Sequence, residues 1–373
     1  MWSQKEKFEF SDLISALKQY RGKSLIQLEK FSQNGYRTPD EIVEIRQAVN
    51  ANADLFEYMA HKAPFTFGGT GPIQVYPTRE EDQFDTMDLH QLSSALKSAA
   101  RDWTSLGEIE RRQTYDPIIA ALKEFLPKDS KILIPGAGLC RLASEIASSG
   151  FIAFANENSF IMIVISQIAF RHKRQFRIFP FLHQISGLEN FRDTLISDIF
   201  PRFQTRDPIQ SKPNGNLIFD IDIANADNDE NVNTDEYQNN KNINLFEPSL
   251  LIENQRLILM AGDIIGMENS QPNIFDAVVT CFFIDVVSDI EKIVTLFYKI
   301  LRPGGYWINM GPLMMHRSDD DFFAKSSFYD TVKIAQKIGF TVVRESRIDT
   351  SYIENPHTNV KTLYKCQFLV VQK

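Results

Sequence analysis

The chain has 373 residues, of which 43% are hydrophobic and 24% are charged, a composition that excludes a disordered or fibrous protein. Its formal net charge is −8 at pH 7, so no overall positive field draws it to nucleic acid or to an anionic membrane. We therefore expect neither of these as a partner.

Three widely separated cysteines, Cys140, Cys281 and Cys366, argue against a disulfide framework and fit a reducing compartment. The sequence has no CxxC pair and no His/Cys cluster with zinc-ligand spacing, so we predict no metal site. The first ten residues are charged and lack the apolar core of a signal peptide, and no apolar run approaches the ~20 residues that a membrane helix needs. These features predict a cytoplasmic protein, with the nucleus as a second location.

The N-terminal third of the chain has a helical pattern. Apolar residues recur at intervals of three and four between residues 11 and 61, and the Thr-Pro-Asp-Glu string at 38–41 predicts a helix start. The stretch 64–77 is rich in glycine and proline and predicts a connecting loop, and a further helical region covers 87–125. We assign residues 1–125 to a helical N-terminal region.

The pattern changes at Lys131 to strands that alternate with helices, which predicts a parallel sheet covered by helices. Residues 205–244 are rich in asparagine and aspartate, and the stretch 225–242 has few apolar side chains, so the segment predicts a flexible surface insertion. We assign 126–373 to one domain that carries this insertion. Its expected strands are 132–135, 151–155, 257–260, 277–281 and 307–310, its helices 141–149, 159–172, 288–301 and 326–338, and its last β-rich runs 340–344 and 362–371.

A turn of small residues joins the first predicted strand of this domain to its first helix. The turn reads Pro135-Gly136-Ala137-Gly138, and glycines there let the backbone approach a ligand while the helix start offers unpaired N–H groups. Glu157 lies 19 residues after Gly138, at the end of the next predicted strand. A carboxylate at that place can accept hydrogen bonds from both hydroxyls of an adenosine ribose. The alternative is an ordinary solvated glutamate at the start of a helix.

The residues around this loop indicate which nucleotide it binds. Arg141 stands where a dinucleotide-binding fingerprint has glycine or alanine, which disfavours a pyrophosphate and favours a nucleoside without phosphate. Asp263 follows a predicted strand, where it could bind an adenine amino group. Phe275-Asp276 then opens an apolar strand, and a helix and the string Leu-Arg-Pro-Gly-Gly at 301–305 precede the next strand. This succession is characteristic of Rossmann-like methyltransferases, so we predict S-adenosyl-L-methionine as cofactor and S-adenosyl-L-homocysteine as its product.

Unusual strings of residues occur along most of the chain. They include the blocks at 101–103, 135–143, 156–160, 180–184, 280–285 and 307–313. In these blocks the chain resembles the carnosine N-methyltransferase family, also called the N2227-like family. The resemblance implies a class I Rossmann-like α/β fold, with a seven-stranded and mostly parallel sheet behind a helical N-terminal segment. It also implies methylation of the imidazole of carnosine, which is β-alanyl-histidine, to give anserine.

The resemblance also implies roles for particular residues. Asp285, His316 and Tyr364 would hold the dipeptide, with Asp285 and His316 as catalytic residues. The chain departs from the family pattern at two places: Cys140 replaces an expected glycine and would bring a side chain near the cofactor, and Ser98 replaces an expected glutamine and would remove one cofactor hydrogen bond. The implied cofactor contacts, to which the glycine loop adds Gly138, are Arg101, Gly136, Glu157, Asp263, Ile264 and Cys281.

The chemistry of an imidazole acceptor favours a carboxylate at Asp285. A neutral imidazole has one donor and one acceptor nitrogen. A carboxylate that accepts the far N–H therefore leaves the near nitrogen free to attack, and it stabilises the imidazolium product. The alternatives are that Asp285 caps the following helix, that His316 is an ordinary loop histidine and that Tyr364 is a core residue. His183 is a further candidate for the pocket.

Three functions remain open on these residues alone. The first is methylation of a small His-containing dipeptide, and the second is methylation of histidine within a protein or peptide, for which the pocket chemistry would be the same. The third is a non-catalytic interaction protein on a decayed methyltransferase fold. The first predicts a small-molecule substrate, and the sequence leaves a homodimer open.

Overall fold

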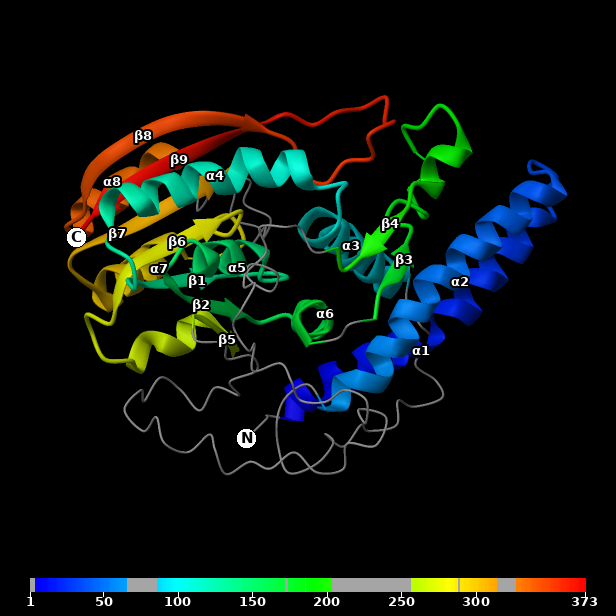
Figure 1. The fold of residues 1–373 in the computed structure, drawn as a ribbon, viewed down its shortest axis with the longest axis horizontal. Helices are drawn as coiled ribbons and strands as arrows, with labels where there is room; N and C mark the ends of the chain where they lie inside the picture. Colours follow the sequence, from blue (N-terminus) through cyan, green and yellow to red (C-terminus); the bar gives the residue numbers. More distant parts are fainter. Residues whose placement is uncertain are drawn as a thin grey trace, which may run out of the picture.

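The computed structural model describes residues 4–65, 86–171, 174–184, 186–202, 256–287, 289–313 and 327–373 (Figure 1). The expected insertion at 205–244, nearly all of the expected loop at 64–77, and His316 lie outside the described residues. Within the described ranges, no helix is both long and apolar enough to cross a membrane.

Two long helices, α1 (Gln4–Ser32) and α2 (Pro39–Lys62), form a hairpin that projects beyond the sheet in Figure 1. The Thr38 hydroxyl accepts the Glu41 N–H at 3.3 Å, and the Glu41 carboxylate accepts the Thr38 N–H at 2.9 Å. This reciprocal capping box confirms the helix start predicted at 38–41. One turn of 3-10 helix, η1 (Ala63–Phe65), follows α2.

The helical stretch predicted up to residue 125 is two helices, α3 (Thr86–Trp103) and α4 (Glu108–Phe125). The break falls just before α4 at Gly107, where an added Cβ would lie 2.0 Å from the carbonyl oxygen of Arg101, so only glycine fits. Periodicity alone does not mark this break, because an isolated glycine also occurs inside helices.

Seven strands form the main sheet in the order β5-β2-β1-β6-β7-β9-β8. The five strands from β5 to β7 are parallel, and β9 runs antiparallel to both of its neighbours, β7 and β8. The predicted seven-stranded, mostly parallel sheet is therefore confirmed. The strands are β1 (Lys131–Pro135), β2 (Ile152–Glu157), β5 (Leu257–Ala261), β6 (Phe275–Cys281), β7 (Leu301–Gly311), β8 (Thr341–Thr350) and β9 (Tyr364–Gln372).

Alternate side chains of the strands enter two apolar cores, one on each face of the sheet. In β1, Ile132 and Ile134 belong to the core shared with α1 to α4, whereas Leu133 belongs to the other core. The first core includes the side chains of α5 and α6, and the second includes those of α7 and α8. These four helices are α5 (Arg141–Ser148), α6 (Phe160–Arg171), α7 (Ile290–Ile300) and α8 (Phe328–Ile338).

Some short elements were not predicted. A separate antiparallel pair joins β3 (Phe176–Ile178) to β4 (Asp198–Phe200), and three residues are too few for an alternating pattern to show. Two 3-10 helices, η2 (Phe191–Leu195) and η5 (Ile264–Asn269), also occur. The other predicted elements are present with shifted ends. Among the strands the largest shifts are in β7, which begins six residues earlier than predicted, and in β8, which ends six residues later.

Candidate active site

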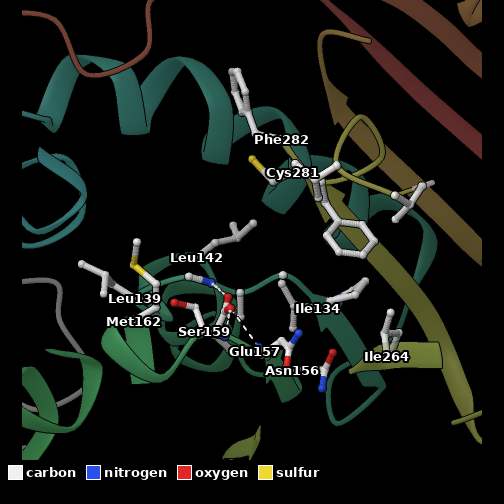
Figure 2. Close-up of a pocket in the computed structure, with 18 of the residues that line it drawn as sticks. Ile134, Leu139, Leu142, Asn156, Glu157, Ser159, Met162, Ile264, Cys281 and Phe282 are labelled. Atoms are coloured by element: carbon white, nitrogen blue, oxygen red, sulfur yellow. Dashed lines mark hydrogen bonds between the residues drawn. The ribbon is translucent and has the colours of Figure 1, made fainter. Parts of the chain in front are cut away.

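A cavity of about 500 Å³ lies at the edge of the sheet where the parallel strands β1, β2, β5 and β6 end (Figure 2). Its wall consists of the ends of these strands and the loops that follow them, the last turns of α3, parts of α4, α6 and α7, and Tyr352 in the connection after Thr350. The volume is within the range of small-molecule sites. All of the residues expected to contact the cofactor lie on this wall, namely Arg101, Gly136, Gly138, Glu157, Asp263, Ile264 and Cys281.

Gly136, the first residue after β1, has a conformation and a neighbour that both require glycine. Its φ is +60°, and an added Cβ would lie 2.3 Å from Cδ2 of Phe283 in the loop after β6. A side chain at 136 would therefore push Phe283, which itself lines the cavity. The absence of a Cβ lets the two loops approach each other.

Glu157 ends β2 and is 9% exposed. One carboxylate oxygen accepts the Gly138 N–H at 2.7 Å, and the other accepts the N–H groups of Asn158 and Ser159, each at 2.8 Å (dashed lines in Figure 2). The carboxyl is therefore buried and anchored, which rules out the alternative of a solvated glutamate. Burial raises the pKa of the Glu157 carboxyl, and the three N–H groups oppose that rise. Since a carboxylate offers about four lone-pair sites, one site stays available to a ligand hydroxyl.

Arg101, near the end of α3, is 9% exposed and lies on the cavity wall. Its guanidinium carbon is 4.6 Å from the ring centre of Tyr352 and 5.6 Å from those of Tyr115 and Phe282. Its Nη1 is 3.4 Å from the Asp102 carboxylate, while Nε and Nη2 are buried and have no hydrogen-bond partner among the described residues. A buried cation with unpaired donors on a cavity wall fits an anionic ligand group such as a carboxylate.

Helix α3 is anchored on the glycine loop. The Trp103 indole N–H donates to the Leu139 carbonyl at 3.0 Å, and the Arg141 guanidinium carbon lies 5.0 Å from the Trp103 ring centre. Arg141 also donates to Glu145 at 2.8 Å and is 1% exposed. The side chain of Arg141 thus joins the core under α3, and it is not on the cavity wall.

The loop after β5 is tied to the end of β2. The Asn156 side-chain amide donates to the Gly262 carbonyl at 2.8 Å. Asp263 then caps η5, since its carboxylate accepts the Ile265 N–H at 2.9 Å, and its side chain is exposed at the cavity rim. Ile264 is buried beside it, 6% exposed. The capping bond fixes the Asp263 carboxylate in direction.

Two of the three cysteines were expected near the cofactor, and of these two the structure places Cys281 on the cavity wall. Burial raises the pKa of the Cys281 thiol to about 11, so a neutral thiol faces the cavity at neutral pH. Ser98 lies on the cavity wall as well. Cys140 is not among the residues that line the cavity. Cys140 has φ +61°, is 1% exposed and packs in the apolar core, and its thiol lies 3.8 Å from the Gly138 carbonyl oxygen.

Of the residues expected to hold the acceptor, Asp285 and Tyr364 lie next to this cavity but not on its wall. Asp285 lies in the turn after β6 and is 3% exposed. The alternative that Asp285 caps α7 is wrong, because Asp289 is the cap and accepts a backbone N–H of that helix at 2.9 Å. Tyr364 begins β9, and its ring centre is 6.0 Å from that of Phe282. Burial is the main cause that raises the pKa of Tyr364, and the charges of Glu354 and Asp285 add to it.

His183, the further pocket candidate, lies elsewhere. Its Nε2 is 3.0 Å from the Tyr20 hydroxyl of α1, and the Asn52 amide of α2 lies 3.4 Å from that same hydroxyl. His183 is therefore a contact of the α1–α2 hairpin, and it is not on the cavity wall. His316 lies outside the described residues.

Four aromatic residues on the cavity wall were not predicted, namely Tyr115, Phe282, Phe283 and Tyr352. Phe282 is inside the unusual block at 280–285, which was a usable indication. Tyr352 follows β8 in an irregular connection, and Tyr115 is within the helical pattern of α4, so neither has a local pattern that indicates a ligand. Figure 2 shows Phe282 and Cys281 across the cavity from Glu157.

The sheet order, with an antiparallel β9 between β7 and β8, and the cavity beside the glycine loop together define the Rossmann-like methyltransferase fold class. The family within that class follows from the sequence. The chain belongs to the carnosine N-methyltransferase family, because residues 78–373 match the model of that family.

Curated relatives carry the same description. The carnosine N-methyltransferase unmet of Drosophila melanogaster is 30% identical over 308 residues, which is 79% of this chain and 58% of that protein. The carnosine N-methyltransferase of Mus musculus is 28% identical over 77% of this chain and 64% of that protein. The one from Schizosaccharomyces pombe is 28% identical over 87% and 81%. The chain thus spans less than two thirds of the length of the first two relatives.

Similar solved structures are more distant. A phosphoethanolamine N-methyltransferase 2 of Haemonchus contortus, in complex with S-adenosyl-L-methionine, is 14% identical, with 81% of this chain and 62% of that chain covered and a TM-score of 0.39. A putative methyltransferase of Haloferax volcanii, in complex with the Trm112 activator, is 11% identical, with 79% and 99% covered and a TM-score of 0.40. The family assignment therefore rests on the sequence match.

Proposed function

We propose that this chain transfers the methyl group of S-adenosyl-L-methionine to an imidazole nitrogen of carnosine or a related His-containing dipeptide, giving anserine from carnosine and S-adenosyl-L-homocysteine. One observation carries the proposal. In a chain of the carnosine N-methyltransferase family, every residue expected to contact the cofactor lines one cavity at the carboxyl edge of the sheet.

The described residues fit this cofactor along its length, and it supplies a methyl group on a sulfonium sulfur. The remaining lone-pair site of Glu157 accepts a ribose hydroxyl. The unpaired donors of Arg101 suit the carboxylate of the amino-acid end, and Asp263 at the rim suits the adenine amino group. Cys281 remains protonated, so no thiolate competes for the methyl group.

On the acceptor side, Asp285 accepts the N–H of the far imidazole nitrogen. This bond keeps the lone pair on the near nitrogen, which is the attacking atom, and the negative charge stabilises the imidazolium as it forms. The proton stays on the far nitrogen during transfer and leaves the product afterwards. Tyr364 and His316 hold the rest of the dipeptide. Alignment of the attacking nitrogen with the methyl group supplies much of the acceleration.

The decisive experiment is a mass-spectrometric assay of the purified protein with S-adenosyl-L-methionine. The acceptors are carnosine, free histidine and a His-containing peptide, each tested separately. We expect methylated carnosine to form fastest. Preferential methylation of the longer peptide would replace the dipeptide proposal with the histidine-in-peptide alternative. Failure to bind S-adenosyl-L-homocysteine in calorimetry would support a non-catalytic protein.

The cellular expectations stay predictions. We expect a cytoplasmic location with the nucleus as a second one, a small-molecule substrate, and no nucleic acid or membrane as partner. A homodimer remains open, and light scattering of the purified chain would decide the oligomeric state.

A further inference from the structure

One buried carboxylate holds the irregular connection that follows β8. Glu110, in the first turn of α4, is 8% exposed. Its Oε2 accepts the Ile353 N–H at 2.6 Å, and its Oε1 accepts the Ser351 hydroxyl at 3.2 Å. In Figure 1 this connection lies beside the N-terminal end of α4. The two residues bound by Glu110 are therefore the immediate neighbours of Tyr352 on either side.

Two further observations indicate that this turn is held in place from outside. The Thr350 hydroxyl donates to the side-chain oxygen of Gln113, one turn further along α4, at 3.1 Å. Ile353 has φ +41°, a left-handed conformation that a β-branched residue rarely adopts. Such a conformation persists only where the surrounding contacts hold it.

The residue between these anchors faces the proposed cofactor site. Tyr352 lines the cavity, and its ring centre lies 4.6 Å from the guanidinium carbon of Arg101 and 4.8 Å from the ring centre of Phe282. It also lies 6.5 Å from the ring centre of Tyr364. Tyr352 thus contacts the cation proposed for the cofactor and lies near the residue proposed for the acceptor.

We propose that Glu110 is a positioning residue that clamps the turn from Ser351 to Ile353, so that Tyr352 closes the cavity against Arg101. In this arrangement the Tyr352 ring fixes the direction of the Arg101 guanidinium, which carries two unpaired nitrogens. The part that concerns ligand affinity rests on the proposed function, because it takes the cavity as the cofactor site. The clamp itself does not depend on any ligand.

The clamp is tested first without ligand, by hydrogen exchange. Glu110→Ala removes both acceptors, so the peptide that covers 351–353 should exchange faster. Glu110→Gln should keep slow exchange, because its amide oxygen accepts the Ile353 N–H and its amide nitrogen donates to the Ser351 hydroxyl. The matched control is Glu108→Ala, an exposed acidic residue in the same helical turn, which should change nothing. Unchanged exchange in Glu110→Ala would overturn the clamp.

The second test asks whether Glu110 acts through Tyr352. Calorimetry with S-adenosyl-L-homocysteine should give an affinity weakened about fivefold or more in Glu110→Ala and, alone, in Tyr352→Ala. The double variant should bind no more weakly than the weaker single variant, because both changes disrupt the same contact. If the two losses multiplied instead, Glu110 would act independently and the positioning role would be wrong. If the wild type did not bind this ligand, the proposed function would fail, and hydrogen exchange would still decide the clamp.

Discussion

Replacing Glu157 by glutamine separates what its carboxylate does for the fold from what it does for a ligand. The amide oxygen can still accept the N–H groups of Asn158 and Ser159, but the amide nitrogen then faces the Gly138 N–H, donor against donor. An unpaired buried donor costs about 1–3 kcal/mol. The same change removes a buried charge whose raised pKa shows that ionisation there is unfavourable. Because the two effects oppose each other, we expect the free energy of unfolding to fall by less than about 2 kcal/mol.

For ligand affinity, no second effect of Glu157→Gln opposes the loss. In Glu157→Gln the ribose hydroxyl loses a charged acceptor and meets an N–H donor, and a charge-assisted hydrogen bond is worth about 1.5–3 kcal/mol. The dissociation constant of S-adenosyl-L-homocysteine should therefore rise about 10- to 150-fold. Calorimetry measures this change, and urea denaturation of the same samples measures stability.

The control for this experiment is Glu124→Gln, near the end of α4, where an exposed carboxylate pairs with Arg344 at 2.8 Å away from the cavity wall. It should leave affinity unchanged. An unchanged dissociation constant in Glu157→Gln would mean that this carboxylate does not contact the ribose, and the cofactor orientation derived from it would have to be abandoned.

Asp285→Asn should lower the methylation rate about 30- to 150-fold, since losing a charge-assisted bond costs about 2–3 kcal/mol. Its affinity for S-adenosyl-L-homocysteine should not change, and a wild-type rate would refute the tautomer-holding role. Asp289→Ala removes the α7 cap and should lower the free energy of unfolding by about 1 kcal/mol in urea denaturation. Gly136→Ala brings a Cβ to 2.3 Å from Phe283, so calorimetry should show lost ligand affinity, and retained affinity would mean that the loops can separate cheaply. Finally, because the pKa of Glu157 is raised above 4.5, affinity should weaken as the pH falls towards that raised pKa, and the dependence should be absent in Glu157→Gln.

The sequence was sufficient to predict those parts of the site whose spatial arrangement follows from a short local pattern. The strand, turn and helix that begin at Lys131 return the chain to the neighbouring parallel strand, so Gly138 and Glu157 end at the same edge of the sheet. Their separation of 19 residues covers α5 and β2, and the hydrogen bond between them follows from this arrangement. The cofactor side of the cavity was predictable for this reason.

Other features depend on contacts between distant segments. The direction of the Cys140 side chain follows from a left-handed residue packed against the core, which no sequence spacing reveals. Tyr352 reaches the cavity because Glu110, more than two hundred residues earlier, binds its neighbours. Asp285 was misassigned as a cap in one alternative because Asp289, four residues later, offers the same side chain at the helix start. Short polar residues near a helix start look interchangeable in sequence, and only the structure distinguishes them.

The hydrogen bond from the Trp103 indole to the Leu139 carbonyl connects the helical region to the glycine loop of the domain with the main sheet. The boundary near residue 125 separates the helical region from the domain with the main sheet. Arg101 and Tyr115 lie before this boundary and Gly136 lies after it, yet all three line the same cavity. A chain cut at that boundary would keep the parallel strands and lose one side of the ligand site. The helical region is therefore not an accessory that could be exchanged among relatives independently of the sheet. Changes in α3 and α4 and changes in the glycine loop must remain compatible with each other.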